Sequence, residues 1–277
     1  MPRVVELHSY PVKGCAGMSL TQAALTPSGL AHDRDFMVVD RDWSFRSQRR
    51  DPRLALIRPE VTAGPEETLT LRGPGVEPVR IAVDTAGPRR EVALFGRPTL
   101  GIDQGDAAAG WLSEVLGAPS RLVRMPPEHH RITDGLTPGR AGYADSGAVH
   151  VVSLASLDLL NERMAARGGD PVAMSRFRPN VVAGGWAEPH AEDEPRDLSV
   201  GDARLAFAKL ATRCAVCLVD QDTGERAGPD PIRTLAGYRR AAGGVAFGAK
   251  FSVLTPGKLS VGDDIHAGGP AGQIPGS

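Results

Sequence analysis

The sequence has little cysteine and no long apolar segment. Three cysteines in 277 residues are an odd number that does not suit a disulfide framework. No stretch approaches the ~20 apolar residues of a membrane-spanning helix. Residues 1–7 also lack the charged start and apolar run of a secretory signal. These absences predict a soluble, cytoplasmic protein without a membrane partner, whose thiols stay free for metals or catalysis.

An excess of charge of either sign is also missing. The 32 Lys and Arg residues nearly balance the 33 Asp and Glu residues, and the net charge is −1 at pH 7. This balance gives no electrostatic reason to expect a nucleic-acid partner, although a local basic site is compatible with a neutral total. Lysine is scarce and arginine abundant, which we attribute to genomic base composition.

Short apolar runs between turn residues predict a mainly β fold with a few helices (α+β). The 33 Gly and 23 Pro residues are spread through the chain. Apolar spacing predicts helices over 106–116 and 153–167, each followed by glycine. Closure of the first strands into a barrel would remove exposed edges. Strands are predicted at 3–7, 36–39, 69–71, 79–83, 181–183, 205–207, 214–219 and 251–254.

A polar stretch around Pro126 and Pro127 interrupts this pattern between residues 118 and 145. It predicts a boundary between two parts of the chain. We therefore expect an N-terminal domain over residues 1–120 and a second domain over 121–267. The Gly- and Pro-rich segment 268–277 is predicted to be a disordered tail.

The strongest chemical signal is the segment ATRCAVCLVDQDTG at 211–224. Arg213 beside Cys214 favours the thiolate form of the cysteine, and a thiolate is a soft ligand for transition metals. Read locally, Cys214 and Cys217 are equally well explained as packed strand cysteines. A redox pair is disfavoured because the predicted strand continues through both. A structural zinc site needs four ligands, so Cys15 and a distant histidine would have to contribute.

Three weaker signals are cationic. The segment RFRPN at 176–180 offers planar donors for phosphate or carboxylate, although alone it is typical of a solvated loop. Lys13 and Gly14 lie in a turn where backbone N–H groups can approach an anion. Arg34 belongs to the segment HDRD at 32–35, for which surface ion pairing is the default explanation.

Taken together and in this order, the segments resemble the molybdenum cofactor sulfurase C-terminal (MOSC) superfamily preceded by its N-terminal β-barrel domain. The resemblance extends from residue 7 to about residue 266, and the chain is most similar to the mitochondrial amidoxime-reducing component and its bacterial relatives. The matching pieces are YPVK at 10–13, HDRD at 32–35, DPRL at 51–54, YAD at 143–145, SLASL at 153–157, RFRPN at 176–180, RC at 213–214, DTG at 222–224 and FG at 247–248.

The resemblance implies an N-terminal β-barrel-like domain, a MOSC β-barrel domain and a molybdopterin cofactor. Cys214 would be the catalytic residue and would bind the molybdenum. Gly14 stands where the amidoxime reducers often have serine, so only its backbone N–H remains for a contact. The positions that match the family's cofactor contacts are Lys13, Gly14, Arg34, Arg178, Asn180, Thr212 and Arg213.

The resemblance also implies an enzyme that reduces N-hydroxylated compounds, such as amidoximes and hydroxylamines, by oxygen-atom transfer. Because the chain lacks the four cysteines of an iron–sulfur cluster, the electrons would come from a separate ferredoxin- or flavoprotein-type partner. Two alternatives stay open. Cys214 would carry a persulfide and donate sulfur, or the protein would carry the molybdenum cofactor without catalysis.

Overall fold

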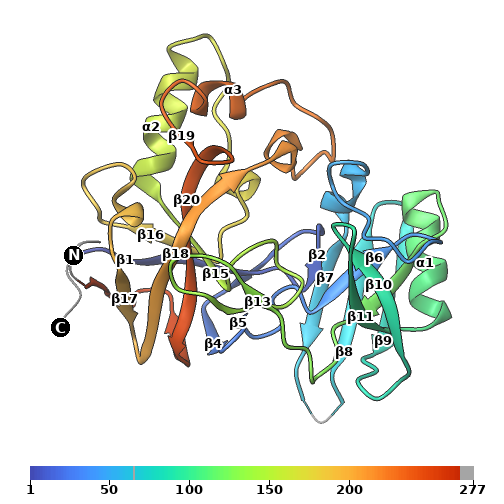
Figure 1. Cartoon of the computed structure of the whole chain (residues 1–277). Coiled ribbons are helices and arrows are strands. Elements are labelled where there is room, and N and C mark those ends of the chain that lie inside the picture. Colours follow the sequence, from blue (N-terminus) through green and yellow to red (C-terminus); the bar gives the residue numbers. More distant parts are fainter. Residues whose placement is uncertain (65, 269–277) are drawn as a thin grey trace.

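The computed structural model describes residues 1–64 and 66–268, which form two lobes side by side (Figure 1). Strands dominate both lobes and only a few helices accompany them, so the predicted mainly β class is confirmed. The predicted disordered tail lies, apart from Gly268, outside the described residues. No helix in the described ranges is long and apolar enough to span a membrane.

The larger lobe is built on one mixed sheet. Its strand order is β22-β17-β18-β20-β15-β16-β1-β3, with β19 paired to β20. The neighbours β15 and β16 run parallel, and α2 (Leu154–Ala165) makes the crossover that such a pair requires. The strands are β1 (Arg3–Ser9), β3 (Met18–Leu20), β15 (Val149–Ser153), β16 (Val181–Gly184), β17 (Asp197–Val200), β18 (Ala203–Arg213), β19 (Arg240–Ala241), β20 (Gly244–Thr255) and β22 (Ile265–Ala267).

Smaller elements complete this lobe. The first is a three-stranded sheet in the order β21-β4-β5, and the second is the pair β13 and β14. These elements are β4 (Gln22–Thr26), β5 (Gly29–Leu30), β13 (Ile132–Thr133), β14 (Gly139–Arg140), β21 (Gly257–Ser260) and α3 (Ile232–Leu235). Val4 and Leu25 from the start of the chain share an apolar core with Val149 and Phe251.

The smaller lobe contains a sheet in the order β10-β11-β12-β6-β2 and a second in the order β7-β8-β9. Phe36, Leu71 and Leu112 lie in the core between these sheets and α1. The elements are β2 (Val12–Lys13), β6 (Phe36–Val39), β7 (Arg58–Thr62), β8 (Thr68–Gly73), β9 (Val76–Ala82), β10 (Arg89–Leu94), β11 (Arg97–Asp103), β12 (Arg121–Arg124) and α1 (Asp106–Leu116). Over the described residues the strand orders of both lobes are open paths rather than closed barrels.

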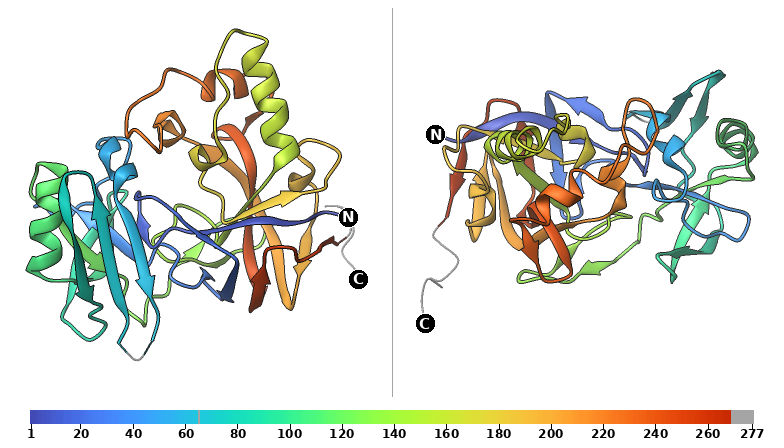
Figure 2. Two further views of the ribbon diagram at one scale, coloured as in Figure 1. Left: turned by 180° about the vertical axis from the view of Figure 1, so that it is seen from behind. Right: turned by 90° about the horizontal axis from the view of Figure 1, so that it is seen from above.

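The lobes share segments. Strand β1 begins at the far end of the larger lobe, pairs there with β16, and runs toward the smaller lobe, where β2 follows (Figure 2). Strand β4 likewise pairs with β21 near the end of the chain. The strand pairing shows that the first 30 residues contribute mainly to the larger lobe. The contiguous division at residue 120 stays a prediction.

The predicted strand over 214–219 is wrong. Strand β18 ends at Arg213, and the chain continues as a 3₁₀ helix over Ala215–Leu218. The backbone N–H of Cys217 donates to the carbonyl of Cys214 at 3.1 Å, while the Cys217 side chain packs into an apolar cluster with Phe247. The chain therefore turns after Arg213 so that Cys217 is buried against the rest of the fold, although the apolar run alone indicates a strand.

Candidate functional site

A cavity between the lobes brings together all of the predicted site residues. They lie at the end of β2, in the loop before β6, in the turn before β16 and at the end of β18. Segments far apart in the sequence thus line one wall. The predicted residues found there are Lys13, Gly14, Arg34, Arg178, Asn180, Thr212, Arg213 and Cys214.

The cavity is strongly cationic. Among the described residues that line it, Asp145 carries the single carboxylate. A cleft with such an excess of one charge attracts ligands of the opposite charge, and guanidinium and ammonium groups are the usual donors to phosphate. The cavity is therefore suited to an anion. Its basic side chains are Lys13, Arg34, Arg49, Arg178, Arg213 and Lys250.

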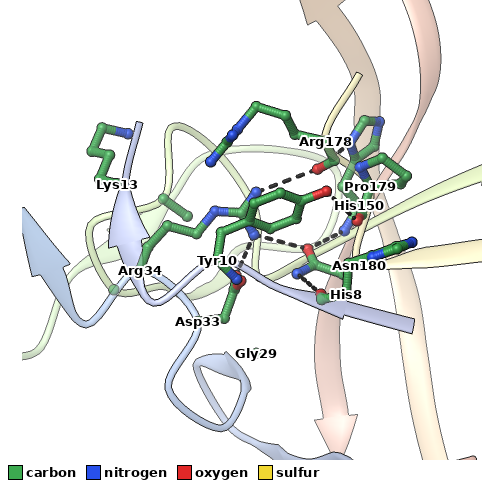
Figure 3. A network of polar contacts seen from close by, with 12 residues as sticks. His8, Tyr10, Lys13, Gly29, Asp33, Arg34, His150, Arg178, Pro179 and Asn180 are labelled. Atoms are coloured by element: carbon green, nitrogen blue, oxygen red, sulfur yellow. Dashed lines mark hydrogen bonds and ion pairs between the residues drawn. The ribbon is translucent and has the colours of Figure 1, made fainter. Parts of the chain in front are cut away.

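Two of these guanidinium groups stack on the ring of one tyrosine (Figure 3). Arg34 lies 4.4 Å and Arg178 4.2 Å from the centroid of the Tyr10 ring. The Tyr10 hydroxyl donates to the carbonyl of Pro179 at 3.1 Å, and burial raises its pKa to about 12. Both arginines adopt a left-handed backbone with φ of 56°. Such strain is concentrated at functional sites.

Asn180 holds neighbouring groups in place. Its side-chain oxygen accepts from Arg34 Nη1 at 3.2 Å and from the backbone N–H of His150 at 3.1 Å. Its Nδ2 donates to the carbonyl of His8 at 3.1 Å. Arg34 is also paired with Asp33, and both are buried. The expectation of surface ion pairing there is therefore wrong.

The alternative interpretation of residues 176–180 as a solvated loop is also wrong. Arg176 and Arg178 are both buried. Arg176 Nη2 pairs with Asp220 at 2.9 Å, and Arg178 Nη1 donates to Gln221 at 3.3 Å. Gln221 in turn is hydrogen-bonded to Gln48, which connects the two lobes beside the cavity. The arginines are fixed by packing that the local sequence does not show.

Lys13 and Asp145 form an ion pair at the cavity wall. Burial lowers the pKa of Lys13, and Asp145 opposes that shift. Loss of solvent acts to raise the pKa of Asp145. The charge of Lys13 and its hydrogen bond, together with the charges of Lys250 and Arg34, outweigh this effect and hold that pKa well below its usual range. The Lys13 ammonium lies 4.9 Å from the ring centroid of Phe95. Beside it, Gly14 has a φ of 85°, which favours glycine.

Cys214 reaches the cavity where β18 ends. The register of β18 against β20 shifts just before this point, and such bulges re-aim side chains. Cys214 has a free, half-buried thiol, whereas Cys217 is buried. Arg213 Nε donates to Cys217 Sγ at 3.3 Å, and Arg213 Nη2 donates to the carbonyl of Phe177 at 2.8 Å. Cys217 thus helps to hold Arg213 beside Cys214.

His150 is a cavity residue that the sequence reasoning missed. Its Nε2 lies 3.3 Å from the carbonyl oxygen of Phe247 and 3.5 Å from Arg213 Nη1. Burial, with the charges of Lys250 and Arg213, lowers its pKa well below the usual value, so the ring is neutral at neutral pH. A signal was present, because a histidine within the apolar strand β15 indicates a buried polar role.

A second cavity adjoins the first. Phe95, Asp145, Ser146 and Thr212 line both. The wall of the second cavity includes exposed apolar side chains, among them Ile132, which is 52% exposed. The same wall carries charged side chains, among them Arg97, Glu128 and Lys209, so a molecule in the second cavity can contact both apolar and charged groups.

Comparison with known proteins identifies the family. Residues 1–119 match the MOSC N-terminal beta barrel domain, and residues 138–266 match the MOSC domain. The mitochondrial amidoxime-reducing component 1 of Mus musculus is 32% identical, over 95% of this chain and 81% of the mouse protein. The chain belongs to the MOSC family. Other members that it resembles are the mitochondrial amidoxime-reducing component 1 of Homo sapiens (30% identical, 95% of this chain, 82% of that protein) and the molybdenum cofactor sulfurase of Danio rerio (31% identical, 88% of this chain, 31% of that protein).

The MOSC cavity fits an anionic cofactor with a thiolate-bound metal. It offers basic side chains for the anion and one accessible thiol, at Cys214. The alternative of a four-ligand zinc site is wrong for the described part of the chain, where no group of three or more His, Cys, Asp and Glu side chains is placed to hold a metal ion. Cys15 is buried in the core of the smaller lobe, with Val12 and Leu54.

Proposed function

We propose that this MOSC protein is a molybdenum-cofactor-dependent oxidoreductase that reduces N-hydroxylated compounds. The observation that carries the proposal is the free thiol of Cys214 in a cavity lined by six basic side chains. Relatives named amidoxime-reducing components, about one third identical over nearly the whole chain, support the reaction class. A separate redox protein supplies the electrons.

In this proposal, four cations bind the anionic part of the molybdopterin: Lys13, Arg34, Arg178 and Arg213. Cys214 binds the metal, and Thr212 and the backbone of Gly14 complete the contact surface. Asn180 acts as a positioning residue, since its amide groups already contact the protein. When bound, the cofactor supplies two-electron chemistry that accepts an oxygen atom.

The protein's own groups would orient the substrate. Its apolar body would lie in the second cavity, against Phe95 and Ile132. Its N–OH group would then point toward the junction, where the Thr212 hydroxyl and the Asp145 carboxylate are available as hydrogen-bond partners. The neutral ring of His150 lies beside Arg213, with its Nε2 3.5 Å from Arg213 Nη1, and would help to hold the guanidinium in the cavity wall.

A turnover assay tests this function. Protein loaded with molybdenum cofactor, given a chemically reduced viologen as electron donor, is expected to convert a hydroxylamine or an amidoxime to the corresponding amine or amidine. The same protein without cofactor is the control, and it is expected to be inactive. The proposal is wrong if molybdenum-replete protein with the donor reduces neither class of compound.

A sulfur-transfer function is the second candidate, favoured by the match to the Danio rerio sulfurase over 88% of this chain. Cys214 would then carry a persulfide. Mass spectrometry of the purified protein separates the two functions. A labile sulfur adduct on Cys214 without bound molybdenum would support sulfur transfer, whereas bound molybdenum with an unmodified thiol would support reduction.

A further inference from the structure

Lys250, which belongs to no recognisable sequence motif, projects into the cavity from the middle of β20. It lies opposite His150 of β15 and Lys209 of β18 in the sheet register. Its stem lies over Gly147, where an added Cβ would come within 2.9 Å of the Lys250 Cβ. Because Gly147 has no side chain, the stem has room to lie flat and carry the ammonium group into the cavity.

Lys250 differs from the other enclosed cations in its partners. Lys13 is paired with Asp145, and Arg34 with Asp33. Arg178 and Arg213 each donate hydrogen bonds to protein oxygens. Within the described residues, Lys250 has neither a hydrogen bond nor an ion pair, so its charge lacks an acceptor.

The charges around Lys250 make this arrangement unfavourable without a ligand. Burial lowers its pKa well below the usual value, and Arg34 and Arg213 lower it further. Asp145 and Asp33 oppose the shift without cancelling it. His150, the neutral ring opposite, adds no negative charge. Proteins keep such enclosed charges where a partner compensates them or where function requires them.

We propose that Lys250 binds an anionic oxygen of the ligand in this cavity, as a fifth cationic contact beside Lys13, Arg34, Arg178 and Arg213. The inference rests on the proposed cofactor binding for the identity of that ligand. The contact itself requires only a phosphate-like oxyanion, which the molybdopterin phosphate and free inorganic phosphate both provide.

Binding of the anion favours the charged form of Lys250. The anion raises the pKa of Lys250, so binding at a pH above the lowered pKa of this lysine takes up a proton. Above the lowered pKa of the free protein, affinity for the anion falls as pH rises, because the proton must be supplied from solution. A permanently charged arginine at this position would add no proton uptake of its own.

Amine labelling tests the contact directly, because the sequence holds four lysines, at positions 13, 209, 250 and 258. Cofactor-free protein is acylated at pH 8 with and without inorganic phosphate or molybdopterin, and each lysine is quantified by mass spectrometry. Labelling of Lys250 is expected to fall several-fold with either ligand, while the exposed Lys258 is unchanged. Equal labelling of Lys250 with and without both ligands would overturn the inference.

Variants provide a second readout. Lys250→Met is expected to weaken binding of phosphate and of molybdopterin about ten- to hundredfold and to reduce the proton uptake seen by calorimetry in buffers of different protonation enthalpy. Lys250→Arg should restore most of the affinity without restoring the proton uptake, and Lys258→Met is the matched control. Cofactor-free Lys250→Met should melt no lower than wild type. Unchanged affinity and proton uptake in Lys250→Met would contradict the proposal.

The two proposals fail separately. If wild-type protein takes up no molybdenum but phosphate still protects Lys250, the proposed function fails and the Lys250 contact stands. If wild type and Lys250→Met retain molybdenum equally, and neither phosphate nor molybdopterin protects Lys250 from labelling, the proposed Lys250 contact is wrong and the proposed function stands.

Discussion

Tyr10 holds two positively charged groups in place by contacting both. The guanidinium groups of Arg34 and Arg178 lie against its ring, and its hydroxyl donates to the carbonyl of Pro179. The negative face of an aromatic ring attracts a cation, which offsets part of the repulsion between the arginines. Tyr10 thus positions two of the proposed cofactor contacts without touching the reacting atoms.

Replacing the Tyr10 ring is expected to cost ligand affinity. Tyr10→Leu removes both stacking contacts, so pterin retained per chain after gel filtration should fall about tenfold, as for about 1.4 kcal/mol of binding free energy. Tyr10→Phe keeps the ring, loses one hydrogen bond worth about 1 kcal/mol of stability, and should retain pterin like wild type. Equal retention in Tyr10→Leu and Tyr10→Phe would show that the stacking is irrelevant.

Single residues of the site were predictable only in part. The cationic residues and the cysteine could be predicted as candidate ligands from the sequence, because positive charge and thiol chemistry are properties of the single side chain. The roles of Tyr10 and Asn180 depend on partners far along the chain, as in the hydrogen bond from Tyr10 to Pro179, 169 positions away. Lys250 lies in no sequence motif, and its place in the site becomes visible only when its neighbours are known.

At the scale of elements, helix α2 is held to its neighbours by a buried carboxylate. Ser153 caps the helix by accepting from the backbone N–H of Ser156. Glu192 is fully buried and accepts from the Ser153 N–H at 3.2 Å and from the Ser156 hydroxyl at 2.7 Å. Because these donors are buried, loss of the carboxylate leaves them unpaired.

Glu192→Ala is therefore expected to destabilise the fold. The free energy of unfolding should drop by about 2–4 kcal/mol, from one or two unpaired buried donors and a small cavity. The exposed neighbour Glu194 is the matched control, and Glu194→Ala should change stability by less than about 0.5 kcal/mol. Urea denaturation measures both, and similar values for the two variants would contradict the assignment.

The sequence predicts a helix or strand well where the residues that begin or end it are its neighbours in the chain. Helix α1 has the predicted limits, because Gly117 with φ of 64° ends it within its own turn. Helix α2 begins after its capping serine for the same reason. The segment after Arg213 is different, since burial of Cys217 and its bond to Arg213 decide its conformation. Apolar periodicity does not contain that information.

At the scale of the whole molecule, the cavity exists only because the lobes are joined. Lys13 and Gly14 come from the smaller lobe, whereas Arg178 and Cys214 come from the larger one. The class of fold follows from short apolar runs and turn residues. The pairing of β1 with β16 does not, because it joins positions more than half a chain apart. Only the ordered resemblance to a family places these distant residues in one site before the structure is known.

The central claim is that Cys214 binds molybdenum. Wild type, Cys214→Ser and the control Cys217→Ser are produced in a molybdenum-sufficient host, and the metal bound per chain is measured. Cys217→Ser keeps a side-chain acceptor for Arg213, so this variant should retain molybdenum like wild type, whereas Cys214→Ser should lose most of it. Equal molybdenum in wild type and Cys214→Ser would contradict the account.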